Sequence, residues 1–495
     1  MKSLDNNISQ ELLHNLETWH QEDEYQKIID AIEALPDSEQ TPDLVSQLAR
    51  AYNNLAGPED RHLLKKAVEL LDSVEEELAE DHNWNFRKGY ALYYLDRELS
   101  ARHYFEKALE LRPGDQDTQE LIRNCSRVLT LPNSMKPFRK RTEEGWQSFL
   151  EGEARLREMI DAKQQEEVVE LCHQLLEPAF QELYFEMGYN GSKYELILSA
   201  EGDRARLFKL VYFKNHAPEE IFENWNIHVG RQPSQGFELC MYDQSISTSD
   251  ALVWVEALED KQVGLTIYCE KLTSLLEENE NQAYSLMAIL LDQAIGEIGA
   301  IRYVGYLELV SRPQEGENIC LDELDSYIGK EIDPERQNRP ITADELCQWY
   351  TAYQQEPSKE EDWELRDDVF AGSTCCVPLV GRFLRGEDTV MEDFHMDGAV
   401  PGFFYYPLEG IPRDQILDLR DLIEQGIERE AGDAVTFLGG ATGTVYGYLD
   451  FIGWDLSEVL DAAVKIFRGE QVEEAFFHTF RRNVGSVCLK RGEQA

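Results

Sequence analysis

Three residues near the C-terminal end carry the side chains that acid–base or nucleophilic catalysis requires. His395 stands in EDFHMDGA, Asp450 in YGYLDFIG and His478 in FFHTFRR. A histidine and a carboxylate within hydrogen-bond reach can move a proton or activate a nucleophile. No GxSxG motif accompanies them. His395 also fits the edge of a hairpin, and His478 fits a half-buried histidine among phenylalanines. These residues are the catalytic candidates, and the alternative is that they only satisfy local hydrogen bonds.

The glycines of FLGGATGTVYGYLDFIGW, at positions 437–454, raise the question of a phosphate-binding loop. Such a loop places its glycines between a strand and the N-terminus of a helix, where free N–H groups bind the anion. Here Gly439, Gly440 and Gly443 precede TVYGYLDFIG, which alternates like a strand. There is no Gly-Lys-Ser/Thr ending and no GxGxxG. The sequence therefore predicts a hairpin or bulge in a β-sheet.

The chain carries none of the spacings typical of metal sites. HExxH, paired CxxC and EF-hand loops are absent from the sequence. Cys375 and Cys376 are adjacent, so on a strand they would point to opposite faces and pack instead of chelating. The nine cysteines are scattered, which indicates reduced thiols. We predict neither a metal nor a cofactor.

Charge restricts the partners that the chain can bind. Its 495 residues include 47 Lys and Arg against 96 Asp and Glu, a formal charge of −49. This negative charge opposes binding to nucleic acid and to anionic membranes. Its role is either to keep the chain soluble or to attract a basic protein partner. No apolar run reaches the roughly 20 residues of a membrane span. The start lacks the layout of a signal peptide, so we expect a cytoplasmic protein of two to four domains.

The first 130 or so residues show helical spacing of apolar residues and almost no strand signal. In NWNFRKGYALYYLDRELSARHYFEKALELRPGD, small, aromatic and proline residues occur at characteristic spacings, and these residues are Gly89, Ala101, Phe105, Ala108 and Pro113. This pattern resembles the tetratricopeptide repeat, which consists of two packed helices and a turn. Trp84 lies one position earlier than the family's tryptophan, and Lys88 replaces its leucine.

A second copy fits LVSQLARAYNNLAGPEDRHLLKKAVELLDSV with an insertion around GPEDRH, and its matching positions are Ala49, Tyr52, Ala67 and Leu71. YQKIIDAIEALP, ending at Pro36, is similar to the second helix of an earlier unit. Short helices cannot bury an apolar face alone, so stacked units support one another. The resemblance covers roughly residues 10–130 and implies an all-α repeat domain that binds proteins. The remainder of the chain resembles no characterised family, and it resembles uncharacterised cytosolic bacterial proteins.

In the tetratricopeptide family, the first helix of each unit lines a groove that receives partner segments. The matching positions, implied to bind a protein partner, are Arg50, Asn53, Asn54, Phe86, Tyr90, Tyr93 and Arg97. From Phe86 to Arg97 these residues follow helical spacing, so we expect them to share one face. Aromatic rings offer rigid contact area, and an arginine with asparagines can hold a peptide carboxylate. The alternative is that the aromatic stripe packs in the core.

A break in composition follows the repeats. LPNSMKPFRKRTEEGW contains two prolines and a cluster of cations, which indicates a boundary segment that neutralises acidic neighbours. Helical spacing resumes and ends with EEVVELCHQLLEPAFQELYF. Strands are then predicted for KYELILSA, ARLFKLVYF, WNIHVGRQ, ALVWVEAL and VGLTIYCEKL. A helix over NQAYSLMAILLDQAIGEIG leads into the strand AIRYVGYLELV.

The last third of the chain shows a comparable order. Helices are predicted for TADELCQWYTAYQQ, RDQILDLRDLIEQGIERE and LSEVLDAAVKIFRG. Strands are predicted for TCCVPLVGRFL, GAVPGFFYYP, AVTFLGG and TVYGYLDFIG, and AFFHTFRR follows the last helix. The predicted fold class is α+β multidomain, with an N-terminal all-α helical repeat followed by one or two α+β modules with antiparallel sheets. The expected domains are residues 1–132, 133–335 and 336–495.

These observations predict a non-enzymatic protein that binds another protein through the repeat groove, as an adaptor or regulator. One version is an inhibitor or immunity-type protein that neutralises a basic toxin or nuclease by charge complementarity. Two alternatives stay open. One is an enzyme whose site lies in the C-terminal module around His395, Asp450 and His478. The other is a small-molecule sensor with a ligand between the modules.

Overall fold

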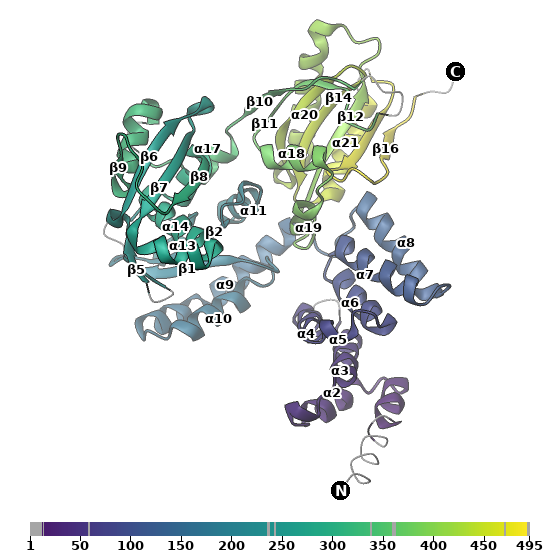
Figure 1. The fold of residues 1–495 in the computed structure, drawn as a ribbon. Helices are drawn as coiled ribbons and strands as arrows, with labels where there is room; N and C mark the ends of the chain where they lie inside the picture. The colour runs from purple at the N-terminus through teal and green to yellow at the C-terminus, as the bar shows by residue number, and fades with distance from the viewer. Residues whose placement is uncertain are drawn as a thin grey trace.

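The computed structural model describes residues 12, 14–57, 60–234, 238–241, 244–336, 339–358, 363–469 and 472–492. Helices alone form the N-terminal part as far as α10, and sheets with helices follow (Figure 1). The prediction of an α+β multidomain fold is therefore confirmed. Residues 1–11, on which the prediction about a signal peptide largely rests, lie outside the described residues, as do residues 58 and 59 of the predicted insertion.

Capping residues determine where several N-terminal helices begin. Thr41, Asp81 and Asp115 each accept a hydrogen bond from the backbone N–H three residues on, at 3.4, 2.8 and 3.0 Å. Pro42 is the first helical residue after Thr41, where its missing N–H is no loss. The helices are α2 (Tyr25–Glu33), α3 (Pro42–Leu55), α4 (Arg61–Asp72), α5 (Glu75–Leu78), α6 (His82–Tyr94), α7 (Glu98–Leu111) and α8 (Gln116–Thr130).

A glycine and an unusual lysine shape the packing of α6. A Cβ on Gly89 would lie 2.8 Å from the Phe105 ring on α7, so the two helices approach closely. Lys88 is buried, but its ammonium group reaches Asp72 at 2.8 Å and lies 4.7 Å from the Trp84 ring centroid. Its apolar stem thus occupies the core while its charge stays paired.

The long helix α9 (Phe138–Asp161) and its successor α10 (Gln165–Leu176) join the N-terminal helices to the sheets. The backbone N–H of Arg139 donates to Trp454 O at 3.0 Å, and its guanidinium pairs with Glu458 at 2.7 Å. A cation of the predicted boundary segment thus neutralises an acid from the far end of the chain.

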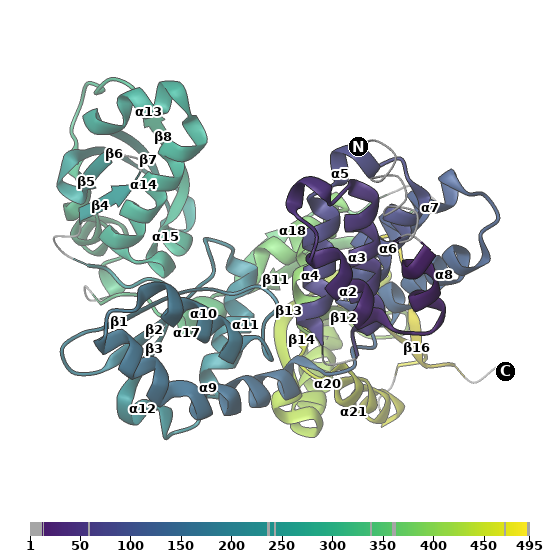
Figure 2. The same ribbon diagram turned by 90° about the horizontal axis from the view of Figure 1, so that it is seen from below.

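Two smaller sheets come first along the chain. The sheet β1-β2-β3 consists of β1 (Tyr184–Tyr189), β2 (Tyr194–Ser199) and β3 (Trp225–Val229). The sheet β8-β7-β6-β9 consists of β6 (Ala251–Ala257), β7 (Val263–Cys269), β8 (Val304–Val310) and β9 (Ile319–Cys320). A separate hairpin pairs β4 (Glu238–Met241) with β5 (Gln244–Ser247). Figure 2 shows the two sheets in separate units, with β6, β7 and β8 above β1, β2 and β3 in this view.

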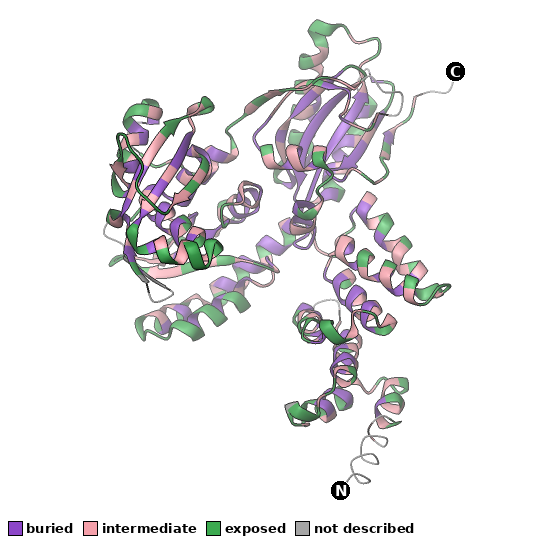
Figure 3. Cartoon of the chain, in the orientation of Figure 1, coloured by how far each residue is buried: buried purple, intermediate pink, exposed green. Residues whose placement is uncertain are grey.

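The third sheet is antiparallel throughout, in the order β10-β11-β13-β14-β12-β15-β16. Its strands are β10 (Thr351–Gln354), β11 (Val369–Thr374), β12 (Val400–Pro407), β13 (Val435–Gly443), β14 (Tyr446–Gly453), β15 (Ala475–Thr479) and β16 (Val487–Lys490). The central strands β12 and β14 are buried almost throughout (Figure 3). One face packs on α20 (Ile416–Ala431) and α21 (Leu456–Gly469), and the other on α18 (Val377–Arg385) and α19 (Thr389–His395).

Two strand pairs depart from the predicted antiparallel pairing. β2 and β3 are parallel, and so are β7 and β8. Parallel neighbours need a crossover of a dozen or more residues. The crossovers are the helices α11 (Arg204–Asn215) and α12 (Ile221–Asn224) in the first case, and α13 (Thr273–Glu278), α14 (Glu280–Ile295) and α15 (Glu297–Tyr303) in the second.

Several predicted segments have a different secondary structure. ARLFKLVYF belongs to α11, which is capped by Asp203 and buried on nearly all sides, so no helical period shows in its sequence. TCCVPLVGRFL ends its strand at Thr374 and becomes α18, and AIRYVGYLELV begins inside α15. TADELCQWYTAYQQ is helical only in α17 (Ala343–Cys347) and then enters β10. His395, predicted at a hairpin edge, is the last residue of α19.

The glycine run is a bulged hairpin, as predicted. β13 leads directly into β14, and the pairing register shifts between Phe437 and Gly439. Gly439 has a φ of 120°, and a Cβ there would lie 2.2 Å from Ser373 O on β11. Only glycine fits this close approach of backbones.

Among the described residues, no single helix is long and apolar enough to cross a membrane. The pair α14 and α15, bent by 100° at the break between them, has that length and composition when taken together.

Buried charges tie the N-terminal helices to the C-terminal part of the chain. Asp96, in the turn after α6, accepts from Arg61 at 2.6 Å and lies 3.5 Å from Arg141 on α9. The same Arg61 guanidinium donates to Met396 O, just after α19, at 2.8 Å. These three residues form one half of a group that we call the junction cluster. Its six residues are Arg61, Asp96, Arg141, Gln181, Lys209 and Asp397.

The second half of the junction cluster centres on Asp397, which is completely buried. Its carboxylate accepts from Lys209 Nζ at 2.7 Å and from the backbone N–H of Gln181 at 2.8 Å. The Gln181 side chain in turn donates to Leu95 O at 2.6 Å and to Met396 O at 2.7 Å. Burial opposes the charge on Lys209, but Asp397 and its neighbour Asp393 raise the pKa of Lys209 overall.

We predict that Asp397→Ala lowers the free energy of unfolding by about 3–5 kcal/mol. It removes one of the two carboxylates that pair with the buried Lys209 ammonium, Asp393 at 3.1 Å being the other, and it leaves the Gln181 N–H without its acceptor. Urea unfolding followed by tryptophan fluorescence measures the change. Asp418→Ala, which removes an exposed carboxylate on α20, is the control. An Asp397→Ala effect as small as that of the control would show that the cluster does not hold the parts together.

Candidate functional site

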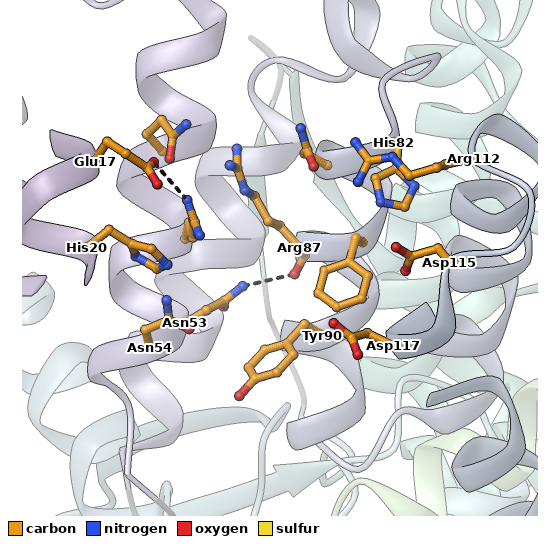
Figure 4. Close-up of a pocket in the computed structure, with 14 residues that line it drawn as sticks. Glu17, His20, Asn53, Asn54, His82, Arg87, Tyr90, Arg112, Asp115 and Asp117 are labelled. Atoms are coloured by element: carbon orange, nitrogen blue, oxygen red, sulfur yellow. Dashed lines mark hydrogen bonds and ion pairs between the residues drawn. The ribbon is translucent and has the colours of Figure 1, made fainter. Parts of the chain in front are cut away.

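A groove of about 470 Å³ lies between α3, α6 and the start of α8 (Figure 4). Its lining residues are Glu17, His20, Gln47, Arg50, Asn53, Asn54, His82, Asn83, Phe86, Arg87, Tyr90, Arg112, Asp115 and Asp117. Five of the seven predicted partner residues are among them. Residues 131–137 of the boundary segment do not line the groove, so the chain's own linker leaves it open.

Of the three arginines that line the groove, Arg50 and Arg87 lack a close carboxylate, and Arg112 lies at the end of the groove with Asp115 and Asp117 (Figure 4). Arg50 pairs with Glu17 at 4.0 Å, its one ion pair in the described part of the chain. Arg87 donates to Ser46 Oγ at 2.7 Å and makes no ion pair with any described residue. Burial lowers the pKa of both arginines, and the charge of Arg50 contributes to lowering that of Arg87 to about 10. Two like charges in a partly buried site favour the binding of an anion.

Polar groups with spare hydrogen-bonding capacity surround these arginines. Asn53 is buried, and its Nδ2 donates to Arg87 O at 2.9 Å, which ties α3 to α6. Its Oδ1 has no partner among the described residues, and neither does Nδ1 of His20. Burial and then the charge of Arg50 lower the pKa of His20, so its imidazole is neutral near pH 7. The arginines therefore supply the positive charge.

Aromatic rings form one wall of the groove, and acids stand at one end. Phe86 packs edge-on against Phe105 of α7, with ring centroids 5.7 Å apart, so its position is fixed. Tyr90 follows it one turn later on α6 and also faces the groove (Figure 4). Asp115 and Asp117, at the start of α8, lie at the end opposite Glu17 and His20 (Figure 4). The groove thus combines the cations Arg50 and Arg87 with a rigid apolar wall, and it has acids at both ends, Glu17 at one and Asp115 and Asp117, beside Arg112, at the other.

Two predicted partner residues lie elsewhere. Helix α6 ends at Tyr94, and Asp96 has a φ of 58°, so the chain turns before Arg97 and the expected common face ends there. Arg97 points toward Glu182, 3.9 Å away, and does not line the groove. Tyr93 also lies outside the lining, and its ring packs on that of Tyr94 with centroids 5.2 Å apart.

Sequence reasoning missed the most informative residue, Arg87. It lies four residues after Asn83 and three before Tyr90, so helical spacing places all three on one face of α6. That signal was present in the sequence. Arg112, Asp115 and Asp117 carried no such signal, because only the folded turn between α7 and α8 brings them to the groove.

The three catalytic candidates are buried and do not form a common site. Asp450 pairs with Arg366, with an Nη1–Oδ1 distance of 2.5 Å. His478 stacks on Phe403 at 5.2 Å between centroids, and both its ring nitrogens lie near backbone carbonyls. His395 lies on α19, and each of the three is at most 2% exposed. A substrate would reach them only if the core opened.

His395 belongs instead to a second buried group between α7, α19 and the residues after β15. Its Nδ1 lies 3.4 Å from Arg481 Nη2 and 4.0 Å from Glu98 Oε2. Glu98 Oε2 and His395 Nε2 have no hydrogen-bond partner among the described residues. Burial, and then the charges of Asp96 and Glu392, raise the pKa of Glu98 to about 8, against the lowering effects of a backbone hydrogen bond and of Arg481. Burial places the pKa of His395 well below its usual range.

Compared with known proteins, the sequence matches no family model and no curated protein. The tetratricopeptide resemblance therefore stays a prediction based on the residues quoted above. In the described ranges, no group of three or more histidine, cysteine or acidic side chains is arranged to hold a metal ion.

We predict that Glu98→Gln stabilises the protein at neutral and alkaline pH. The pKa of Glu98 is about 8 in the folded chain and near its usual value of about 4.3 in the unfolded chain. Between these values the unfolded state loses the proton first, so this residue destabilises the fold increasingly as pH rises. Glutamine removes that effect. We expect the melting temperature to rise by about 3–8 °C at pH 8 and to stay unchanged at pH 4.

Thermal unfolding followed by circular dichroism measures this difference. The control is Glu110→Gln, which neutralises an exposed carboxylate on the same helix. An equal effect of Glu98→Gln at both pH values would contradict the assignment.

Proposed function

We propose that the chain is a non-enzymatic protein-binding protein, an adaptor or regulator, whose N-terminal helices form a tetratricopeptide-type domain. Its groove receives an extended segment of a protein partner. The observation that carries the proposal is the pair Arg50 and Arg87, two partly buried cations in an open groove. Among the described residues, the one ion pair that these two arginines make is the 4.0 Å contact of Arg50 to Glu17.

A carboxylate is the group that best complements this pair. It can accept two parallel hydrogen bonds from a guanidinium, and charge-assisted bonds contribute roughly 1.5–3 kcal/mol each. A carboxylate between the arginines also offsets their mutual repulsion. The Asn53 amide and the Phe86 ring suit the backbone and side chains of an adjoining peptide segment. The acidic end at Asp115 and Asp117 suits a basic residue of the same segment.

The charge of the whole chain supports a basic partner. A formal charge of −49 attracts a positively charged protein from a distance and speeds association, most strongly at low salt. We propose that the acidic surfaces of the α+β part provide a second contact, which an inhibitor or immunity-type protein acting in the cytoplasm would use. One partner protein can have both features, a terminal carboxylate that binds in the groove and a basic surface that contacts the acidic part of this chain.

A matched pair of peptide libraries tests the groove. Random peptides of about ten residues are made twice, with a free C-terminal carboxylate and with an amide. We expect the full-length chain to select peptides from the first pool. Amidation of a selected peptide, or Arg87→Gln in the protein, is expected to weaken binding at least about ten-fold by fluorescence anisotropy.

The control variant is Arg123→Gln, which removes an exposed cation from α8 and leaves the groove intact. It is expected to bind as the wild type does. If amidation and Arg87→Gln leave the affinity unchanged, or if no peptide is selected from either pool, the groove is not a carboxylate-directed peptide site.

A further inference from the structure

A second hollow, of about 970 Å³, lies where three parts of the α+β region meet. One wall comes from the loop that leads from β2 into α11, a second from α14 and α15, and a third from α18. Figure 2 shows α14 and α15 in one unit and α11 in the next, with α18 beyond. We call this hollow the inter-sheet cleft. Its volume is that of sites for small organic molecules.

Apolar and small residues form the floor of the inter-sheet cleft. Ile289 and Ile301, on α14 and α15, and Pro378 on α18 line it. Gly381 also lines it, and among the described residues a Cβ at this position would meet only the Arg385 guanidinium, at 3.3 Å. A glycine inside a helix costs about 0.5–1 kcal/mol relative to alanine. Here it keeps the cleft wide on the side of α18.

The balance of charged residues in the cleft lining is opposite to that of the whole chain. Acids outnumber Lys and Arg by 96 to 47 in the sequence, yet four arginines and only three acids line the cleft. Arg231 is held by Asp292 at 3.1 Å and by two glutamates. Arg382 pairs with Asp203 at 3.3 Å. The acids of the lining are therefore engaged by arginines.

Arg204 is the cation of the lining that remains for a ligand. Its Nη2 donates to the carbonyl oxygens of Leu346 and Trp349, at 3.4 and 3.0 Å. It forms no ion pair with a carboxylate in the described parts of the chain. Burial, followed by repulsion from Glu297, raises the pKa of Asp292 in the lining to about 7, despite Arg231. The lining therefore carries less negative charge near neutral pH than its composition indicates.

We propose that the inter-sheet cleft binds a small amphipathic organic anion. Its anionic group, a carboxylate, sulfonate or phosphate, contacts Arg204. Its apolar body lies on Ile289 and Ile301 of α14 and α15 and faces Gly381. This site is separate from the groove and requires no partner protein. It makes the chain a binder of small molecules as well as of protein segments.

Anilinonaphthalene sulfonate is a suitable probe, because it is an amphipathic organic anion whose fluorescence rises in an apolar site. We expect the full-length chain to bind one dye molecule saturably. Arg204→Gln is expected to weaken that binding at least about five-fold through loss of a charge-assisted contact. Ala288→Trp, which places a large ring in the cleft from an exposed position on α14, is expected to abolish it.

Arg429→Gln is the charge-matched control, since it removes an exposed arginine from α20. It is expected to bind the dye as the wild type does, and circular dichroism verifies that every variant is folded. Absence of saturable binding by the wild type overturns the proposal. Equal binding by Arg204→Gln, Ala288→Trp and the control also overturns it, because the dye then lies elsewhere. Neither result bears on the peptide groove.

Discussion

The junction cluster is the interaction on which the arrangement of the molecule depends. Asp96 and Asp397 bring together charges from α4, α9, α11 and the ends of α6 and α19. Burying these groups is unfavourable, and the loss of one partner leaves a bare charge in the core. The parts therefore dock in one register. None of the cluster residues lines the groove, so the cluster does not cover the face of α6 with Phe86, Arg87 and Tyr90.

Although the chain is acidic, both the groove and the inter-sheet cleft are lined by arginines. In the groove, Arg50 and Arg87 face an open channel between helices, which suits an extended protein segment. In the inter-sheet cleft, Arg204 stands beside an apolar floor, which suits a compact molecule. The acidic exterior opposes the approach of free anions, so binding at either site requires specific contacts that exceed this repulsion. The two sites share a chemistry of recognition and differ in the shape of the ligand.

Features that depend on local sequence could be predicted. The N-terminal helices follow from the helical period and from capping residues, and the central strands follow from the strand pattern. The glycine bulge follows from the backbone conformations that only glycine adopts, and Gly89 lets α6 approach Phe105 because glycine has no side chain. Helix α11 was mistaken for a strand because it is apolar on nearly all sides. The junction cluster could not be predicted, since Lys209 and Asp397 are 188 residues apart. The sequence allowed a ligand between the modules, but the residues that line the inter-sheet cleft could not be predicted, because its walls come from separated segments.

Amide hydrogen exchange of the full-length chain tests the central claim, that the junction cluster holds the N-terminal helices against the C-terminal part. The N–H of Gln181 donates to Asp397, and that of Arg97 to Leu92 O, directly beside Asp96. The account predicts that peptides spanning these two amides exchange as slowly as those from the buried strand β14. Exchange as fast as that of the exposed segment 311–317 would show that the parts move independently, and would contradict it.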